Sequence, residues 1–209
     1  MVRPVICFID DSDFEHDLVR AEIAPQSETH AFVQAHTFEE AEERLGPAAP
    51  SLFLLDLWGQ DPDVPEPVIT PLETLQERAA AIPDLESVYL GLDAFPGDRN
   101  NEYLKRLFRI VDGWRTLFEA ACAGVGQNRK YGLRNLALAR ERYPGVPAVF
   151  YTRKSLISDA VAMLRAGCDG LYIKPTGADD EETRRLTRAY APELLEALHR
   201  IMSTPSSPS

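Results

Sequence analysis

Short apolar runs alternate with helical patterns along most of the chain. Residues 5–9 form a continuous apolar run of strand length, as expected of a strand that is buried on both faces of a sheet. Segment 51–58 is the clearest strand of the chain, and its apolar residues also end on a carboxylate, that of Asp56. Weaker or shorter runs lie at 31–33, 147–152 and 171–174. The alternation predicts an α/β fold with a doubly wound parallel sheet of five strands. Amphipathic spacing predicts the intervening helices at 14–23, 38–45, 133–142, 155–166 and 179–202.

The alternation is interrupted after the third strand. Between about residues 60 and 129 the pattern predicts two helices, at 71–82 and at 102–122, with Asn101 as the N-cap of the longer one. We therefore predict a single domain over 1–202 with a helical insertion at about 60–129, between the third strand and the third helix of the sheet domain. The Ser/Pro-rich segment 203–209 is expected to be a disordered tail.

Charge and cysteine usage narrow the class of protein. The net charge of −11 disfavours binding to nucleic acid or to an anionic membrane surface. The three cysteines lie far apart with no metal-binding spacing, which favours reduced thiols in the cytosol. The sequence has no apolar run of about 20 residues and no signal-peptide pattern at its start. We therefore expect a cytoplasmic protein that contacts neither nucleic acid nor membrane.

Polar residues follow the predicted strands at one edge of the sheet. Because ligands bind at the carboxyl ends of strands in open parallel sheets, we expect these side chains to converge. Three carboxylates, a hydroxyl and an ammonium group would meet there, and clustered carboxylate oxygens favour Mg²⁺. Such a set can stabilise a phosphoryl group on an aspartate. The residues are Asp10 and Asp11 after the first strand, Asp56 after the third, Thr152 at the end of the fourth and Lys174 at the end of the fifth.

Each of these residues taken alone has an ordinary structural explanation. Asp10 or Asp11 is more often a helix N-cap, Asp56 could cap a turn, and Lys174 before a proline commonly marks the end of a strand. The functional interpretation depends on all five residues occupying the ends of four strands.

These segments resemble the receiver domains of two-component response regulators. The resemblance covers about residues 4–59 and 130–202 and implies the flavodoxin-like fold of CheY-like receivers. The segment Gly167 to Pro175 is similar to the family's GADGYLTKP stretch. The matching sequences are VICFIDD at 5–11, LLD at 54–56, VFYT at 149–152 and AGCDGLYIKP at 166–175.

The resemblance implies a phosphoacceptor and a metal site. Asp56 would receive the phosphoryl group, and Mg²⁺ would be bound by Asp56, by Asp11 directly, by Asp10 largely through water and by the backbone carbonyl of Trp58. The phosphoryl donor would be a sensor histidine kinase or a phosphotransfer protein. Any enzymatic activity would be limited to self-phosphorylation and autodephosphorylation.

The resemblance also implies roles for the last two strands. Thr152 would donate a hydrogen bond to the phosphoryl group, and Lys174 would pair with the aspartyl phosphate and precede a cis peptide bond to Pro175. Two positions depart from the family pattern. Arg153 replaces a small residue beside the site, and Leu171 occupies the position of the switch aromatic. These departures bring phosphorylation and the usual switching mechanism into question.

Three hypotheses remain open. The first is a single-domain receiver in a phosphorelay that signals through an unknown protein target or through homodimer formation, with the insertion governing partner access. The second is a pseudo-receiver that acts as an interaction module without phosphorylation. The third is a Mg²⁺-dependent haloacid-dehalogenase-like phosphatase, with its nucleophile in the Asp11-Ser12-Asp13 segment. The sequence does not identify the kinase, the pathway or the target.

Overall fold

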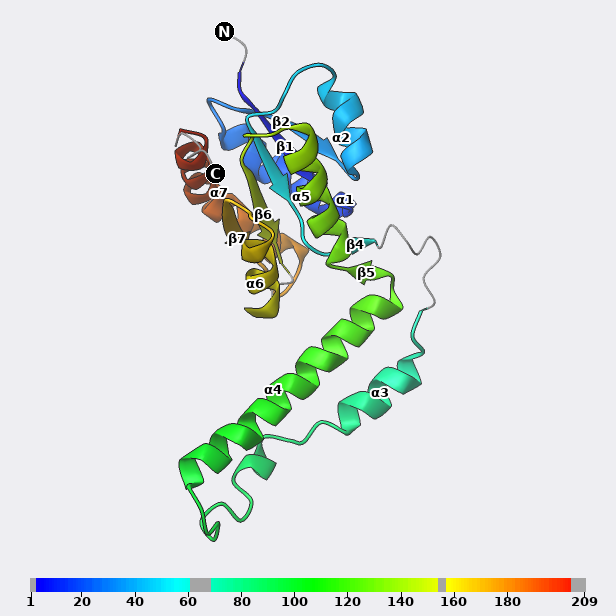
Figure 1. Ribbon diagram of the computed structural model, residues 1–209, viewed down its shortest axis with the longest axis vertical. Coiled ribbons are helices and arrows are strands. Elements are labelled where there is room, and N and C mark those ends of the chain that lie inside the picture. Colours follow the sequence, from blue (N-terminus) through cyan, green and yellow to red (C-terminus); the bar gives the residue numbers. More distant parts are fainter. Residues whose placement is uncertain (1–2, 61–68, 154–156, 204–209) are drawn as a thin grey trace. The chain divides into compact units, whose positions relative to one another are not determined.

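A computed structural model describes residues 3–60, 69–153 and 157–203 of the chain (Figure 1). The chain divides into two compact units. The first comprises residues 1–62 and 129–209, and the second comprises residues 63–128. Within the described ranges, no helix is both long enough and apolar enough to cross a membrane.

A five-stranded parallel sheet forms the centre of the first unit. Its strand order is β2-β1-β3-β6-β7, and every neighbouring pair is parallel. Every residue of β3 and β6 is buried, which agrees with their continuous apolar sequences. The predicted doubly wound sheet of five strands is confirmed. Its strands are β1 (Val5–Ile9), β2 (Ala31–Ala35), β3 (Leu52–Leu55), β6 (Ala148–Thr152) and β7 (Gly170–Ile173).

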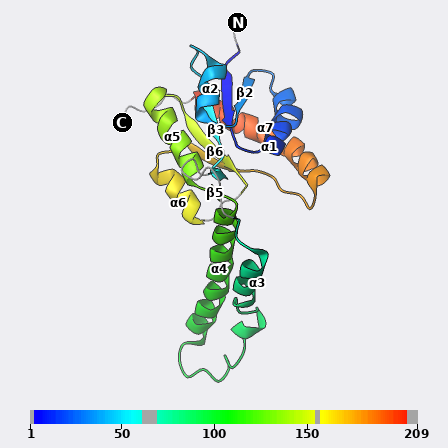
Figure 2. The same cartoon turned by 90° about the vertical axis from the view of Figure 1, so that its right-hand side faces the viewer.

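Helices cover both faces of this sheet (Figure 2). One face carries α1 (Asp13–Leu18) and α7 (Asp180–Ser203), and α1 continues through a π-helical turn (Val19–Ile23) and a 3₁₀ turn (Ala24–Gln26). The other face carries α2 (Phe38–Leu45), α5 (Lys130–Arg142) and α6 (Ile157–Arg165). This two-layer covering explains why the central strands are apolar on both sides.

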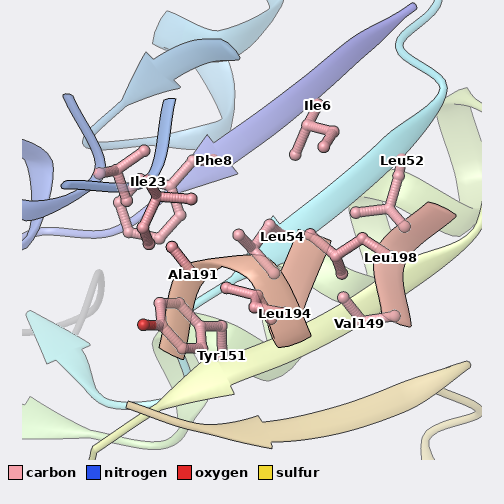
Figure 3. Close-up of a cluster of buried hydrophobic side chains, with 11 residues drawn as sticks. Ile6, Phe8, Ile23, Leu52, Leu54, Val149, Tyr151, Ala191, Leu194 and Leu198 are labelled. Atoms are coloured by element: carbon pink, nitrogen blue, oxygen red, sulfur yellow. The ribbon is translucent and has the colours of Figure 1, made fainter. Parts of the chain in front are cut away.

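The two faces of the sheet form separate halves of the core. Alternate residues of the strands, including Phe8, Leu54 and Tyr151, pack with Leu194 and Leu198 of α7 (Figure 3). On the other face, Phe38 of α2 stacks on Phe53 with their ring centroids 5.7 Å apart. The strand period of two residues produces this division.

Helix α7 continues through Pro192, although proline lacks the N–H that would bond to the carbonyl of Arg188. The side-chain amide of Gln26 donates a hydrogen bond to that carbonyl at 2.9 Å. A partner from another helix therefore satisfies the acceptor that the proline leaves open.

The second unit contains two antiparallel helices joined by the irregular segment 81–98, which includes a 3₁₀ turn (Figure 1). Asp98, and not Asn101 as predicted, is the N-cap of the longer helix, and its carboxylate accepts hydrogen bonds from the N–H groups of Asn100 and Asn101. The helix therefore begins three residues earlier than expected. The elements are α3 (Leu72–Ala80), a 3₁₀ turn (Glu86–Val88) and α4 (Arg99–Gly124), and the short strands β4 (Gly59–Gln60) and β5 (Gln127–Asn128) lie near the junctions of the two units. Of the predicted tail 203–209, Ser203 ends α7 and residues 204–209 lie outside the described part of the chain.

Candidate functional site

Four of the predicted side chains are at the carboxyl edge of the sheet. Asp10 follows β1, Asp56 follows β3, Thr152 ends β6 and Lys174 follows β7. All four are buried. The parallel register of the strands explains their convergence, because consecutive strands of such a sheet end at the same edge.

Lys174 joins two of the carboxylates. Its ammonium group donates hydrogen bonds to Oδ2 of Asp10 and to Oδ1 of Asp56, the latter at 2.9 Å. The aromatic rings of Phe8 and Tyr151 lie 5.8 and 5.7 Å from Nζ. Asp10 also accepts a hydrogen bond from the N–H of Ser12 through Oδ1 at 2.9 Å. The buried ammonium group therefore neutralises part of the charge of two carboxylates.

Burial and mutual repulsion disfavour the ionised form of both carboxyl groups. Burial is the main reason that the pKa of Asp56 rises to about 6. The positive charge of Lys174 lowers this pKa, and the negative charge of Asp10 raises it. Burial likewise raises the pKa of Asp10, against the opposing charge of Lys174. Burial opposes the charge of Lys174, but the carboxylates of Asp10, Asp56 and Glu15 raise its pKa above the usual value. One cation does not fully compensate these carboxylates.

Thr152 places a buried hydroxyl beside the same carboxylates. Within the described residues, its Oγ1 has no hydrogen-bond partner of ordinary geometry, although its proximity to Asp56 contributes to lowering the pKa of that carboxyl group. A buried polar atom without a firm partner is costly. The hydroxyl is therefore available to a group bound at Asp56.

The other two predicted ligands are at the margin of this cluster. Asp11 is half-buried, and its Oδ2 accepts a hydrogen bond from the N–H of Gln60 at 2.9 Å. Trp58 is buried, and its indole N–H donates to Asp159 of α6 at 3.3 Å. Arg129 lies over the indole ring at 5.3 Å and pairs with Asp159 at 3.1 Å. The structure thus fixes the indole of Trp58 through α6 and the start of α5.

Arg153 and Glu15 form an ion pair that sequence reasoning did not predict. The guanidinium donates to Oε1 of Glu15 at 3.2 and 2.6 Å, and it also donates to the carbonyl of Pro175 at 3.0 Å and to the hydroxyl of Thr176 at 3.1 Å. Glu15 in turn lies 3.6 Å from the ammonium of Lys174. Arg153 was identified as a departure from the family pattern, but its partner was not. The two residues are 138 positions apart, so no local pattern connects them.

Two glycines allow a close approach between the start of α5 and the chain at the end of β3. A Cβ on Gly132 would lie 2.3 Å from the carbonyl oxygen of Asp56, and the N–H of Gly132 donates to the carbonyl of Leu57 at 3.1 Å. A Cβ on Gly59 would lie 2.6 Å from the ring of Tyr131, whose hydroxyl donates to the carbonyl of His36 at 2.6 Å. Sequence analysis did not single out either glycine, because nothing local shows that the start of α5 returns to this part of the chain.

The donor chemistry of the site fits a hard divalent cation. The carboxylate oxygens of Asp10, Asp11 and Asp56 are of the kind that Mg²⁺ prefers, and burial raises the pKa of both Asp10 and Asp56. However, no three His, Cys, Asp or Glu side chains of the described residues are already arranged around a metal position. Lys174 bonds to two of the carboxylates instead, so a cation would have to compete with this ammonium group.

Comparison with known proteins identifies the fold. No family model matches the sequence, and no curated protein matches it significantly. Among solved structures, the chain is similar to the response regulator domain of Thermotoga maritima CheB, with 16% identity, a TM-score of 0.52 and coverage of 99% of this chain and 100% of that one. The chain has the fold of a response regulator receiver domain. Other similar structures include the HemR receiver domain of Leptospira biflexa, at 14% identity and a TM-score of 0.48 over 99% of this chain and 100% of that one.

The receiver fold has two local features that bear on earlier expectations. The predicted cis bond between Lys174 and Pro175 is wrong, since no peptide bond of the described residues is cis. Trans is the lower-energy isomer, and the carbonyl of Pro175 accepts the hydrogen bond from Arg153 in this conformation. Tyr172 packs against the α7 side of the core, whereas its neighbour Leu171 alternates to the opposite face of β7.

Proposed function

We propose that this chain is a response regulator receiver that accepts a phosphoryl group on Asp56. The observation that supports this most directly is the convergence of Asp56, Asp10 and Lys174 in one buried cluster beside the unbonded hydroxyl of Thr152. The arrangement supplies a nucleophile, a cation and a hydrogen-bond donor at one point.

The transfer converts a carboxylate into an acyl phosphate. An oxygen of Asp56 attacks phosphorus, the bond from phosphorus to the donor breaks, and the electron pair leaves with the donor. For a phosphohistidine on a sensor kinase or phosphotransfer protein, the leaving group is imidazole. Lys174 would then pair with a phosphoryl oxygen, and Thr152 would donate its hydroxyl hydrogen to another.

Mg²⁺ is the proposed cofactor, held by Asp10, Asp11, Asp56 and the backbone carbonyl of Trp58. When bound, it would neutralise charge on the phosphoryl oxygens. The raised pKa of Asp56, caused first by burial, favours such a cation because a second positive charge restores the reactive carboxylate. The proposed readout is contact with a protein target in the cytoplasm or formation of a homodimer.

The intact mass of the protein tests this proposal directly. Incubation with Mg²⁺ and acetyl phosphate should add one phosphoryl group to the wild-type protein and none to Asp56→Asn. Asp13→Asn is the matched control, because that carboxyl group is 97% exposed and pairs with His36 outside the buried cluster. EDTA should abolish the increment in the wild-type protein and in Asp13→Asn. An increment that persists in Asp56→Asn would contradict the assignment of the phosphoacceptor.

A pseudo-receiver is the second candidate function, favoured by the bonds of Lys174 to both Asp10 and Asp56. If the ammonium group occupies the place of the cation, the site is stable without phosphorylation. A folded wild-type protein that gains no mass from acetyl phosphate or from a phosphohistidine donor would favour this alternative. The phosphatase hypothesis has less support, because Asp13 begins α1 and pairs with His36 at the surface.

A further inference from the structure

One face of helix α4 already contacts other parts of the second unit. A Cβ on Gly113 would lie 3.1 Å from Cγ1 of Ile82, so the helix backbone is close to the chain that follows α3. Arg106 donates hydrogen bonds from the same side to the carbonyls of Val88 and Leu90, at 3.3 and 2.6 Å. This face therefore holds α4 against the rest of its own unit.

The opposite face of α4 carries large apolar side chains in solvent. Leu104, Phe108 and Val111 are 46%, 65% and 56% exposed, and Trp114 beside them is 54% exposed. At 3.6 residues per turn, Val111 and Gly113 lie about 160° apart around the helix. The exposed residues thus form a stripe that faces away from the inner contacts, and single exposed apolar residues are ordinary whereas a contiguous group indicates an interface.

The spacing of this stripe matches the seam of a coiled coil. From Leu104 the steps are four residues to Phe108 and three to Val111, and the same alternation continues to the half-buried Arg115 and Phe118. Such a seam fits another straight helix, because its residues stay on one side over several turns. The stripe from Leu104 to Phe118 would extend about 21 Å along the helix axis.

The charges along the seam favour pairing with a second, antiparallel α4. In a parallel pair, Arg115 would face Arg115 of the other copy. In an antiparallel pair that places Phe108 opposite Phe118, Arg115 would instead face Val111 and lie beside Asp112. Arg115 already pairs with Asp112 at 2.7 Å within its own helix. The exposed Lys105 would lie near Glu119 of the other copy in the same register, where Glu119 also pairs with Arg115 of its own helix at 3.1 Å.

We propose that the outer face of α4 is a self-association surface on which two copies of this chain pack their α4 helices antiparallel. A symmetric pair uses the same stripe twice, so the surface must complement itself. The apolar seam and the placement of Arg115 beside Asp112 both satisfy this requirement. The surface is built from residues of the second unit alone and does not depend on phosphorylation of Asp56, so its failure and that of the proposed function can be told apart.

Sedimentation velocity of the full chain over a range of concentrations tests the association. The mass of the wild-type protein should rise from that of the 23.3 kDa monomer toward twice this value. Phe108→Glu should raise the dissociation constant at least about 10-fold, because it places a charge in the apolar seam. Leu90→Glu is the matched control, since Leu90 is 79% exposed in the same unit but lies off the stripe. A wild-type protein that stays monomeric, or equal weakening by both variants, would overturn the proposal.

Spin-label distances test the orientation. Asn100→Cys, labelled in a Cys168→Ser background, places a probe at the start of α4, and Cys7 and Cys122 are buried. In the antiparallel register, the two labels should be about 40 Å apart, because they lie at opposite ends of the paired helices. Side-by-side parallel helices would bring them within about 10–20 Å, and that result would overturn the proposed pairing. Circular dichroism confirms that each variant retains its helices.

Discussion

At the scale of single residues, the charge balance of the buried site depends on Lys174. It bonds to Asp10 and Asp56 together, yet the pKa of Asp56 still rises to about 6 because burial outweighs this attraction. The site without a bound cation therefore contains a carboxylate whose ionisation opposes folding. A variant that removes only the charge of Asp56 should show how much its ionisation destabilises the fold.

Asp56→Asn should stabilise the protein at neutral pH in the presence of EDTA. The folded pKa of about 6 exceeds the ordinary value of 3.8, so the penalty is complete above pH 6 and disappears below pH 4. We expect the free energy of unfolding at pH 7.5 to rise by roughly 1–3 kcal/mol, with the gain fading as the pH falls from 6 to 4. Urea titrations between pH 4 and pH 7.5 measure this change in the free energy of unfolding. A gain that grows toward acidic pH would contradict the assignment.

Arg153→Ala should destabilise the protein because it leaves Glu15 largely buried without its guanidinium partner. The free energy of unfolding should fall by about 1–3 kcal/mol at pH 7. Arg153→Lys should recover part of it, since an ammonium group restores the charge but not the several directed hydrogen bonds. The phosphorylation rate with acetyl phosphate should be measured on the same variants. An unchanged free energy of unfolding in Arg153→Ala would show that the ion pair is dispensable.

The residues at strand ends could be predicted from sequence, whereas their cross-chain partners could not. Asp10, Asp56 and Lys174 were found because each follows an apolar run that the sheet must bury. The pairing of Arg153 with Glu15 depends on the tertiary fold that brings α1 near the residue after β6, and no periodicity encodes it. Whether Asp10, Asp11 and Asp56 bind Mg²⁺ stays a prediction.

At the scale of elements, the start of α5 fixes the position of the strand that ends at Asp56. The N–H of Gly132 bonds to the carbonyl of Leu57, and no side chain fits between them. Helix α5 was predicted to begin at 133 and begins at Lys130. Its first turn is held by a tertiary contact with the end of β3, which the local sequence does not show. The cap of α4 was misplaced for a related reason: Asp98 and Asn101 are both good capping residues, and local sequence does not choose between them.

Gly132→Ala should destabilise the first unit and displace Asp56. Its Cβ would lie 2.3 Å from the carbonyl oxygen of Asp56 and 2.6 Å from Cα of Leu57, and the backbone must move to admit it. The expected cost is about 2–4 kcal/mol, with slower phosphorylation by acetyl phosphate.

Gly113→Ala is the matched control within another helix. Its Cβ would lie 3.1 Å from Cγ1 of Ile82 and touch no backbone atom within the same distance, so a small shift of the neighbouring segment relieves the contact, and alanine favours helix by about 1 kcal/mol. Thermal unfolding should therefore show little loss in this variant. Equal destabilisation by both substitutions would contradict the importance of the approach to Asp56.

At the scale of the whole molecule, the chain leaves the first unit after residue 62 and returns at residue 129. The five strands and their helices all belong to the first unit. Its core is formed by contacts among its own elements, including those of α7 with the sheet. The first unit therefore has what it needs to fold without the second.

Replacement of Asp61–Gln127 by a short Gly/Ser linker should leave the first unit folded. We expect the variant to keep cooperative thermal unfolding and to gain one phosphoryl group from acetyl phosphate, while it stays monomeric because α4 is absent. Circular dichroism, intact mass and sedimentation velocity measure the three outcomes. Loss of the fold would show that the second unit is a structural part of the receiver rather than an insertion.

The close contact of Thr70 with Gly124 also affects how the chain folds. A Cβ on Gly124 would lie 2.3 Å from Oγ1 of Thr70, so the two ends of the helical hairpin meet. In the sheet, β3 pairs with β6, a strand that the ribosome delivers only after the entire second unit. A hairpin that forms early from local contacts draws the intervening chain into a short loop, and this lowers the entropy that must be lost before the two strands can pair. The folded hairpin would thus speed the closing of the sheet relative to an unstructured segment of the same length, even though it contributes no strand to that sheet.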